Sequence, residues 1–175
     1  MKAIVRIAIG SVIVITGLMG CKKEEGGTSR LTVKMIDAPG DFQQVNVEVL
    51  QVKVHHEVGG WVDLPTNAGV YDLLTLQHDV SATLVNGGDL PAGKINQLRL
   101  VLGENNTVMV DSIIHPLATP SAQMTGLKIN LNHTFSPNHL YQLVVDFEAG
   151  NSVVEQGNGS YSLKPVIKVE SIIPL

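Results

Sequence analysis

The most constraining feature of this chain is an alternation of apolar and polar residues that runs from Leu31 almost to the C-terminus. Leu31, Val33 and Met35 are apolar, for example, whereas the residues between them are polar. Side chains on a β-strand point alternately to its two faces, so this period predicts strands with one buried face. We therefore expect a chain built almost entirely of strands.

The long segment VNVEVLQVKVHHE changes phase in its middle. Its apolar residues are odd-numbered up to Val49 and even-numbered from Leu50 onward. One extra residue would restore a single apolar face, so we predict a β-bulge or a bend between sheets near Val49. Gly59 and Gly60 then predict a hairpin turn into the segment WVDL.

Further strands are predicted by the segments LPAGKINQLRL, TVMV, LKINL, LYQLVVDFE and YSLKPVIKVESI. Residues 77–88 have the weakest pattern, and we expect a short helix around residues 81–85. Pro165 has no N–H, so its strand should lie at an edge or pair on one side only. About eight or nine short strands separated by turns predict a single antiparallel β-sandwich of the prealbumin or immunoglobulin type.

The N-terminus has the layout of a bacterial secretion signal. Lys2 and Arg6 precede an uncharged apolar run that ends on small residues before Cys21, the only cysteine. A membrane-spanning helix needs about 20 apolar residues, and this run is shorter, so we expect residues 1–20 to be a cleaved signal peptide. The segment LMGC resembles the lipobox of bacterial lipoproteins, which implies acylation of Cys21; the alternative is an ordinary signal with a chance cysteine.

The four residues after the cysteine form a compact charge cluster: Lys22, Lys23, Glu24 and Glu25. They resemble the signal that sends some lipoproteins to the outer membrane surface, which implies a location facing the cell exterior, with the periplasmic face as the alternative. We assign residues 21–30 to the lipidated cysteine and a flexible tether, and residues 31–175 to the folded domain. N-terminal acyl chains would hold the protein stably on the membrane. A nine-residue tether spans at most roughly 32 Å, which keeps the domain close to it.

Charge and cysteine content limit the partners. The chain has 12 Lys and Arg against 16 Asp and Glu, and removal of residues 1–20 takes away two basic residues, which leaves a net charge of about −6. An acidic surface disfavours nucleic acid and anionic lipid head groups. With its one cysteine used for anchoring, the domain has no internal disulfide and depends on packing. We expect a monomer.

Several segments occur in the order and spacing of a bacterial family. They are DAPGDFQQVNVEV, the Trp of GGWVDL, YDLLTL, LPAGKINQLRL, GLKINL, LVVDFEAGNSV and YSLKPVIKV. By these motifs, which cover essentially the whole mature chain, the protein resembles the family labelled domain of unknown function 4382. Ile95 departs from a position where that family often has an aromatic residue. The resemblance implies a lipid-anchored or secreted sandwich similar to prealbumin and carboxypeptidase-regulatory domains, and it implies no activity.

The sequence predicts no enzyme, no catalytic residue and no cofactor, because it contains no G-x-S-x-G elbow and no local grouping of Ser, His and Asp. Adjacent His55 and His56 should face opposite ways on a strand, and no HxH or HExxH pattern occurs, so we predict no metal site. Four acidic residues that flank turns are the calcium alternative: Asp37, Asp41, Asp146 and Glu148. Asp37 is more simply a turn residue.

Aromatic residues give the candidate binding positions, since sugar rings often stack on them. Tyr141, Phe147 and Tyr161 are in phase with aliphatic residues and are predicted to belong to the core. Trp61, at a strand start, and Phe42, in a turn, are the candidate ligand-binding residues. For Trp61 the simpler interpretation is a side chain that covers the core, since Trp is highly buried on average.

We therefore expect a non-enzymatic, lipid-anchored module that binds a glycan, a peptide or another envelope protein. The structural alternative is a subunit or anchor of a surface filament, which would need an incomplete sheet for strand donation. A hydrolase, the third and least favoured class, would need a polar cleft with perturbed acid or base groups. The segment DSI resembles a bacterial O-glycosylation acceptor motif, which predicts modification of Ser112.

Overall fold

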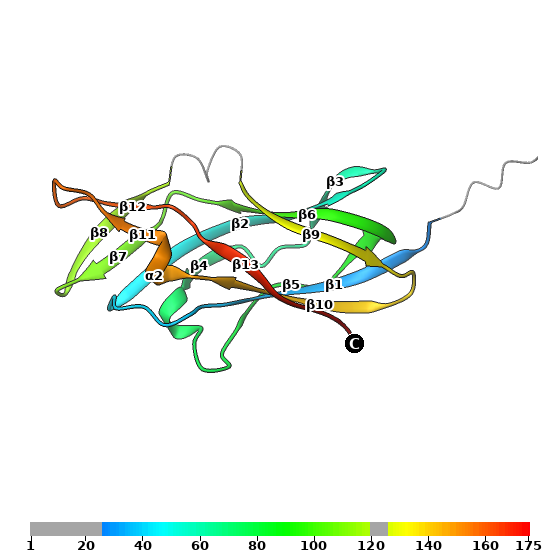
Figure 1. The fold of residues 1–175 in the computed structure, drawn as a ribbon, viewed down its shortest axis with the longest axis horizontal. Helices are drawn as coiled ribbons and strands as arrows, with labels where there is room; N and C mark the ends of the chain where they lie inside the picture. The colour runs from blue at the N-terminus through cyan, green and yellow to red at the C-terminus, as the bar shows by residue number, and fades with distance from the viewer. Residues whose placement is uncertain (1–25, 120–125) are drawn as a thin grey trace, which may run out of the picture.

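The computed structural model describes residues 26–119 and 126–175, and these form two β-sheets packed face to face (Figure 1). The predicted all-β sandwich is thus confirmed. The predicted signal peptide, Cys21 and the charge cluster after it lie outside the described residues. Within the two described ranges, no helix has the length and apolarity needed to cross a bilayer.

The smaller sheet has four strands in the order β13, β10, β1, β5. Their bounds are β1 (Thr28–Ile36), β5 (Ala82–Pro91), β10 (Leu140–Phe147) and β13 (Ile167–Pro174). The first of them, β1, begins three residues before the predicted start of the domain at residue 31. It pairs in parallel with β10 and antiparallel with β5, so it lies inside the sheet with both neighbours in place.

The larger sheet has nine strands, in the order β11, β12, β8, β7, β2, β6, β9, with β3 and β4 both paired to β2. The bounds are β2 (Gln44–His56), β3 (Gly60–Leu64), β4 (Gly69–Asp72), β6 (Gly93–Leu102), β7 (Thr107–Val110), β8 (Ile113–Ala118), β9 (Leu127–Phe135), β11 (Val153–Glu155) and β12 (Tyr161–Leu163). The strands β12 and β8 are parallel. The described chain therefore has more strands than predicted and two parallel pairs in a mostly antiparallel sandwich, because periodicity reports burial and not pairing direction.

The predicted bulge in the long strand β2 is confirmed. Val49 pairs with Leu102 and Gln51 pairs with Val101, so Leu50 is the extra residue. Its side chain is 47% exposed, whereas the valines on either side of the bulge are fully buried. The bulge therefore keeps the whole apolar face of β2 on the core despite the change of phase in the sequence.

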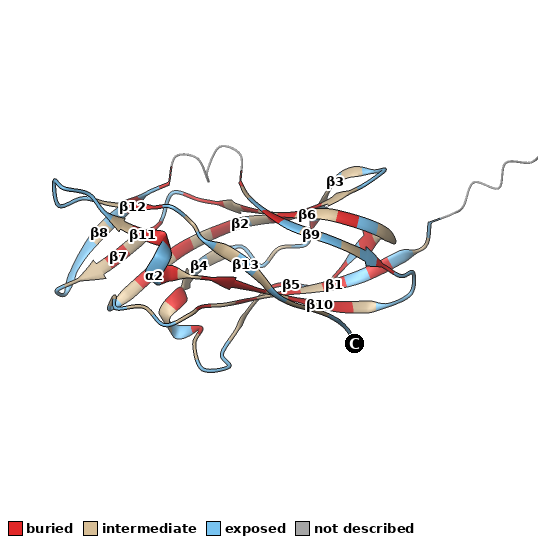
Figure 2. Ribbon diagram, viewed as in Figure 1, coloured by how far each residue is buried: buried red, intermediate tan, exposed pale blue. Residues whose placement is uncertain are grey.

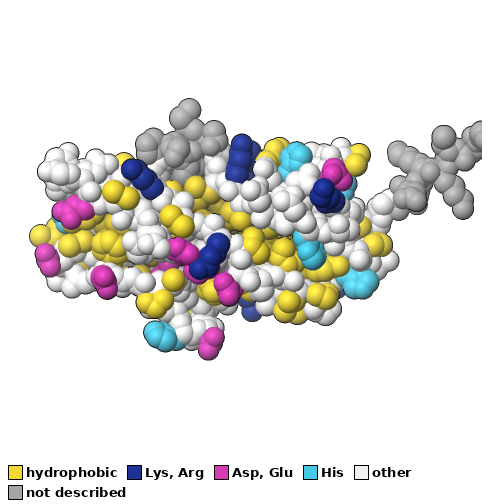
Figure 3. All heavy atoms as spheres, in the orientation of Figure 1, with side chains coloured by type: hydrophobic (Ala, Val, Ile, Leu, Met, Phe, Trp, Pro, Cys, Tyr) yellow, Lys and Arg dark blue, Asp and Glu magenta, His cyan; other side chains and the backbone are white. Residues whose placement is uncertain are grey.

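The core lies between the two sheets, where buried residues follow the inner faces of the strands (Figure 2). The predicted inward positions of β1 are fully buried, and Tyr141 and Phe147 of β10 are core residues as predicted. Tyr161 is partly buried and packs against this core. Figure 3 shows hydrophobic side chains in a band along the molecule, with acidic and basic side chains scattered around it.

The prediction of a helix around residues 81–85 is wrong, because residues 82–85 belong to β5. Neighbouring Leu84 and Val85 are both buried, and the register between β1 and β5 shifts on each side of Val33. These irregularities remove the period-two signal of the strand. The helical elements of the described chain are short: a 3₁₀ turn, η1 (Leu73–Thr75), and one α-helical turn, α2 (Ala149–Ser152).

The segment predicted as one strand around Pro165 is two strands in different sheets. The chain leaves the larger sheet after β12 and enters the smaller sheet as its edge strand β13, with Pro165 in between. Buried Ser152 holds this crossing: its carbonyl accepts from the Lys164 N–H at 2.8 Å and its hydroxyl accepts from the Val166 N–H at 2.9 Å. Pro165 thus lies outside both strands, where its missing N–H costs no hydrogen bond between strands.

Candidate ligand-binding face

Trp61 lies on the outer face of the larger sheet. It is opposite His55 across the β2–β3 hairpin, and its side chain is 36% exposed. The guanidinium carbon of Arg99, from β6, lies 4.0 Å from the centroid of the Trp61 ring, and the His55 ring contacts it edge-on at 5.0 Å. The core-covering interpretation of Trp61 is therefore wrong: the ring is held on the surface by a cation and an imidazole.

A row of charged side chains crosses this outer face beside Trp61. Lys53 of β2 is opposite Asp63 of β3 on one side and Arg99 of β6 on the other, and Arg99 is opposite Lys128 of β9. Lys53 and Asp63 form an ion pair at 3.0 Å. Neither Arg99 nor Lys128 makes an ion pair with any of the residues described. The row thus carries two uncompensated positive charges.

A second row of polar side chains runs parallel to the first. Gln97 of β6 is opposite His55, and Asn130 of β9 is opposite Gln97. The two amides are joined by a hydrogen bond of 3.3 Å from Gln97 Nε2 to Asn130 Oδ1. We call the two rows together the Trp61 face: Lys53, His55, Trp61, Asp63, Gln97, Arg99, Lys128 and Asn130. It offers an aromatic ring, cations and amides on one side of a sheet.

Gly126 leaves room for the Arg99 side chain. A Cβ at Gly126 would lie 2.7 Å from Arg99 Cγ and 2.8 Å from Cδ, and the backbone φ of +69° also favours glycine. Arg99 Nε is buried without a hydrogen-bond partner among the described residues. The aliphatic stem therefore lies flat on the sheet, and the guanidinium group is directed over Trp61.

His56 does not belong to this face although it follows His55. Its Nδ1 accepts from the Val58 and Gly59 N–H groups at 3.3 and 3.0 Å, and its Nε2 lies 3.1 Å from the Ala92 carbonyl oxygen, to which it donates. The ring therefore clamps the β2–β3 turn to the β5–β6 turn. In the described ranges, no group of three His, Cys, Asp or Glu side chains is placed to hold a metal ion.

Phe42, the second candidate, lies at the opposite end of the sandwich. It is partly buried against the core and lines a depression of about 140 Å³ beside Met109 and Val110. Phe42 precedes β2 by two residues, whereas Trp61 pairs near the end of β2, which places them roughly 40 Å apart at ~3.3 Å per residue. The two aromatic candidates therefore cannot form one binding site.

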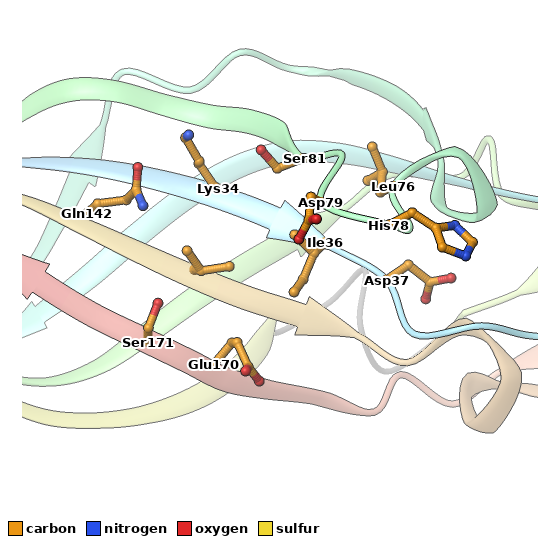
Figure 4. Close-up of a pocket in the computed structure, with 11 residues that line it drawn as sticks. Lys34, Ile36, Asp37, Leu76, His78, Asp79, Ser81, Gln142, Glu170 and Ser171 are labelled. Atoms are coloured by element: carbon orange, nitrogen blue, oxygen red, sulfur yellow. The ribbon is translucent and has the colours of Figure 1, made fainter.

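A cavity of about 310 Å³ lies on the outer face of the smaller sheet (Figure 4). Its lining mixes both charges with apolar residues: Lys34, Ile36, Asp37, Leu76, His78, Asp79, Ser81, Gln142, Val144, Glu170 and Ser171. Figure 4 shows the loop with Asp79 and Ser81 reaching the end of β1 beside Ile36. This is the kind of polar cleft that a hydrolase would need.

Asp37 is the perturbed acid of this cavity. Burial, opposed in part by hydrogen bonds, raises the pKa of Asp37 from 3.8 to about 6. Its Oδ1 accepts from the Ala149 N–H at 2.8 Å and its Oδ2 accepts from Gln77 Nε2 at 3.4 Å. Both oxygens are thus used to tie the end of β1 to two other segments, which is the role of a structural carboxyl group.

Asp146 and Lys168 are paired next to Asp37. Lys168 Nζ lies 3.1 Å from Asp146 Oδ2 and 2.8 Å from Glu148 Oε1, and these contacts raise the pKa of Lys168 above its usual value. Asp146 Oδ1 is buried with no hydrogen-bond partner in the described chain. Asp146 and Glu148, two carboxylates of the calcium alternative, thus share a lysine.

Ser112, the predicted glycosylation site, is exposed at the tip of the β7–β8 hairpin. Asp111 and Ser112 have φ values of +50° and +63°, which is the geometry of a two-residue primed turn. The Ser112 N–H donates to Gln43 Oε1 at 2.7 Å. Its hydroxyl group is therefore on an ordered and accessible turn.

The fold and the outer face together define a β-sandwich of two sheets with a candidate binding face and no assembled metal centre in the residues described. A family profile described as "Domain of unknown function (DUF4382)" matches residues 28–165, so the chain belongs to this family. The matched range ends before β13, which completes the smaller sheet. No curated protein and no solved structure matches the chain.

Sequence reasoning selected Trp61 but missed the residues around it. Arg99 and Lys128 lie on strands that follow Trp61 by more than 30 positions, and only the register of four strands brings them together. The signal available in the sequence was that each stands between two apolar residues, which predicts that it points outward. That signal gives the face of each side chain but not its neighbours.

Proposed function

We propose that this protein is a non-enzymatic, lipid-anchored module of the outer membrane that binds a glycan on the Trp61 face. The observation that carries the proposal is the stack of Arg99 on a surface Trp61. A stacked indole is ordered before a ligand arrives, so little side-chain entropy is lost on binding. Trp61 as a residue remains 36% exposed, which leaves it accessible to a sugar.

The chemistry of the face suits a carbohydrate. The C–H bonds of a sugar ring pack against the electron-rich indole, and sugar hydroxyls need donors and acceptors close by. Gln97 and Asn130 supply both from neighbouring strands. Aromatic, amide and arginine side chains on one rigid sheet satisfy the needs of such a ligand without a deep pocket.

The non-enzymatic part of the proposal rests on how Asp37 is used. A general acid needs its proton directed at a substrate, but both oxygens of Asp37 accept hydrogen bonds from the protein. The raised pKa of Asp37 follows from burial. A hydrolase therefore has a cleft in its favour, but the buried carboxyl group of that cleft, Asp37, is engaged in holding the fold.

The filament alternative has no specific observation in its favour. Strand donation fills a gap in an incomplete sheet, but β1 already lies between β10 and β5. A filament contact would have to form at an edge strand such as β13, β5, β9 or β11. At one of these edges, β13 carries Lys168 and a bulge between its pairs with Val144 and Val145, and both features discourage strand addition there.

Cys21 and the charge cluster 22–25 carry the anchoring part of the proposal. Six residues separate Cys21 from Thr28, where β1 begins, so Thr28 lies within roughly 25 Å of the lipid anchor. The Gly27 carbonyl accepts from the Ala92 N–H at 2.8 Å, which places the chain entry at the β5–β6 turn and near the β2–β3 hairpin. The Trp61 face is therefore at the membrane-proximal end, and Phe42 is at the distal end.

The proposal is tested with the full-length protein in nonionic detergent and a panel of immobilised neutral and acidic polysaccharides. We expect at least one polysaccharide to retain the wild type, and Trp61→Ala to weaken that binding at least about tenfold. Phe42→Ala is the matched control, since it removes an aromatic side chain from the far end and should leave binding unchanged. Retention of no polysaccharide, or equal binding by the Trp61 variant, would overturn the proposal.

A further inference from the structure

We infer that the ligand of the Trp61 face is an acidic polysaccharide, a chain of carboxylate-bearing sugars that lies across the row of Lys53, Arg99 and Lys128. This inference rests on the proposed function and deepens it by naming the ligand class. The evidence for it is the pattern of charges on the sheet, which is an observation independent of the exposure of Trp61.

The row places like charges directly opposite one another. Lys53 is opposite Arg99, and Arg99 is opposite Lys128, on three consecutive strands. Like charges at opposite positions of neighbouring strands destabilise a sheet. Asp63 neutralises Lys53 at 3.0 Å, but in the described chain no carboxylate compensates Arg99 or Lys128. An anion held above these two residues would relieve that repulsion.

The local charge is opposite in sign to that of the whole protein. The chain carries a net charge of −4, so its overall field repels anions. A small anion would gain little from two partly exposed cations in water. A polymer that presents a carboxylate on successive sugars gains several such contacts at once, because the charged positions repeat at about 4.8 Å from strand to strand.

Arg99 has the geometry of a carboxylate receptor. A guanidinium group can donate two parallel hydrogen bonds to one carboxylate, and stacking on an aromatic ring fixes its plane. Trp61 provides that stacking at 4.0 Å, and Gly126 leaves room for the stem. Exposed Lys128 adds a more mobile charge beside it. Arg99 can therefore bind one carboxylate through two hydrogen bonds, and Lys128 can attract a second carboxylate nearby.

The amide row distinguishes an acidic polysaccharide from other polyanions. A uronic acid presents hydroxyl groups next to its carboxylate, so it can bond the cation row and the adjacent Gln97–Asn130 amides together. A sulfated polymer or DNA supplies the charge but presents different groups to the amides. The two parallel rows thus match a ligand in which charge and hydroxyl groups alternate within each unit.

The test compares two forms of one polymer. Short polygalacturonate fragments and the same fragments methyl-esterified on their carboxylates are titrated into the full-length protein in nonionic detergent. We expect the acidic form to bind at least about tenfold more tightly than the esterified form, and its affinity to fall as salt is raised. The double variant Arg99→Gln with Lys128→Gln should abolish this preference. Arg99→Lys, which keeps the charge but cannot donate two parallel hydrogen bonds, should reduce the preference.

Controls separate the outcomes. Lys34→Gln removes a charge from the other sheet and should leave binding unchanged, and a thermal melt of each variant verifies its folding. Equal binding of both polymer forms would overturn this inference and leave the proposed function standing. Binding of neither form, together with no retention on any neutral polysaccharide, would overturn both. Equally tight binding of dextran sulfate and DNA, lost in the same double variant, would also overturn it by showing a general polyanion site.

Discussion

Arg99 stacks on Trp61 across the strand that separates them. Trp61 pairs with His55 and Arg99 pairs with Lys53, so the two side chains come from strands on either side of β2 and meet over it at 4.0 Å. They are 38 positions apart in the sequence. The contact therefore forms only when the sheet is assembled, so a ligand that needs this contact binds only the folded protein.

Replacing Trp61 with alanine should cost little stability. The ring is partly exposed, so the loss is mainly its cation–π contact, about 0.5–1 kcal/mol. Phe135→Ala is the buried comparison, and it should cost about 3–5 kcal/mol because it leaves a cavity. Urea denaturation of both variants gives the two free energies of unfolding. Similar losses would mean that Trp61 is a core residue after all.

The bulge predicts opposite results for two leucines on adjoining strands. Leu50→Ala should change the free energy of unfolding by less than about 0.5 kcal/mol, because the side chain is exposed. Leu98→Ala should lower it by about 2–5 kcal/mol, because that side chain is fully buried in β6. Chemical denaturation measures both. If Leu50→Ala were as costly as Leu98→Ala, the bulge would be misplaced.

Asp37 should make stability fall as the pH rises from about 4 to about 6. The folded protein holds the Asp37 proton up to a pKa of about 6, whereas the unfolded chain releases it near 3.8, so deprotonation favours unfolding by up to about 3 kcal/mol. The stabilising effect is complete below the lower pKa and lost above the higher one. Asp37→Asn should remove this part of the pH dependence.

The measurement for Asp37 is urea denaturation of wild type and variant at several pH values across that window. The difference between the two proteins isolates Asp37 from Glu48 and Glu148, whose pKa values are lowered by hydrogen bonds and which act in the opposite direction. The variant should gain stability relative to wild type as the pH rises. A constant difference at every pH would refute the role of Asp37.

The hairpin tip gives a prediction for Ser112. Protein isolated from its native host should carry a mass above that of the polypeptide and its acyl chains, and Ser112→Ala should lose that increment. Thr107→Ala, a change on the partly buried face of the same hairpin, should keep it. Intact-mass spectrometry distinguishes the cases, and a native mass without any increment would eliminate the modification.

Protease added to intact and to lysed cells tests the anchoring part of the proposal. We expect wild-type protein to be digested on intact cells, and a variant with neutral residues at positions 22–25 to be protected until lysis. Cys21→Ser should release the protein from the membrane fraction. Protection of the wild type on intact cells would place it on the periplasmic face.

Local sequence patterns predicted which face of each strand is buried better than they predicted which strands are neighbours in the sheet. The phase change between Val49 and Leu50 was sufficient to locate the bulge, because burial on one face imposes period two. Residues 81–85 gave no such period, since a strand with two register shifts buries adjacent side chains. The Trp61 face was only partly predictable, because cross-strand partners are set by long-range pairing.

The parallel pairing of β1 with β10 has a consequence for the order of assembly. Leu31 pairs with Tyr141, a separation of 110 residues. The edge of β1 that faces β10 therefore stays unpaired until most of the chain has been made. Closing so long a loop is slow and leaves hydrophobic surface uncovered meanwhile. During export from the N-terminus, β1 could pair with β5 early but would keep its other edge exposed until β10 arrives, and binding by a chaperone would protect that edge from aggregation.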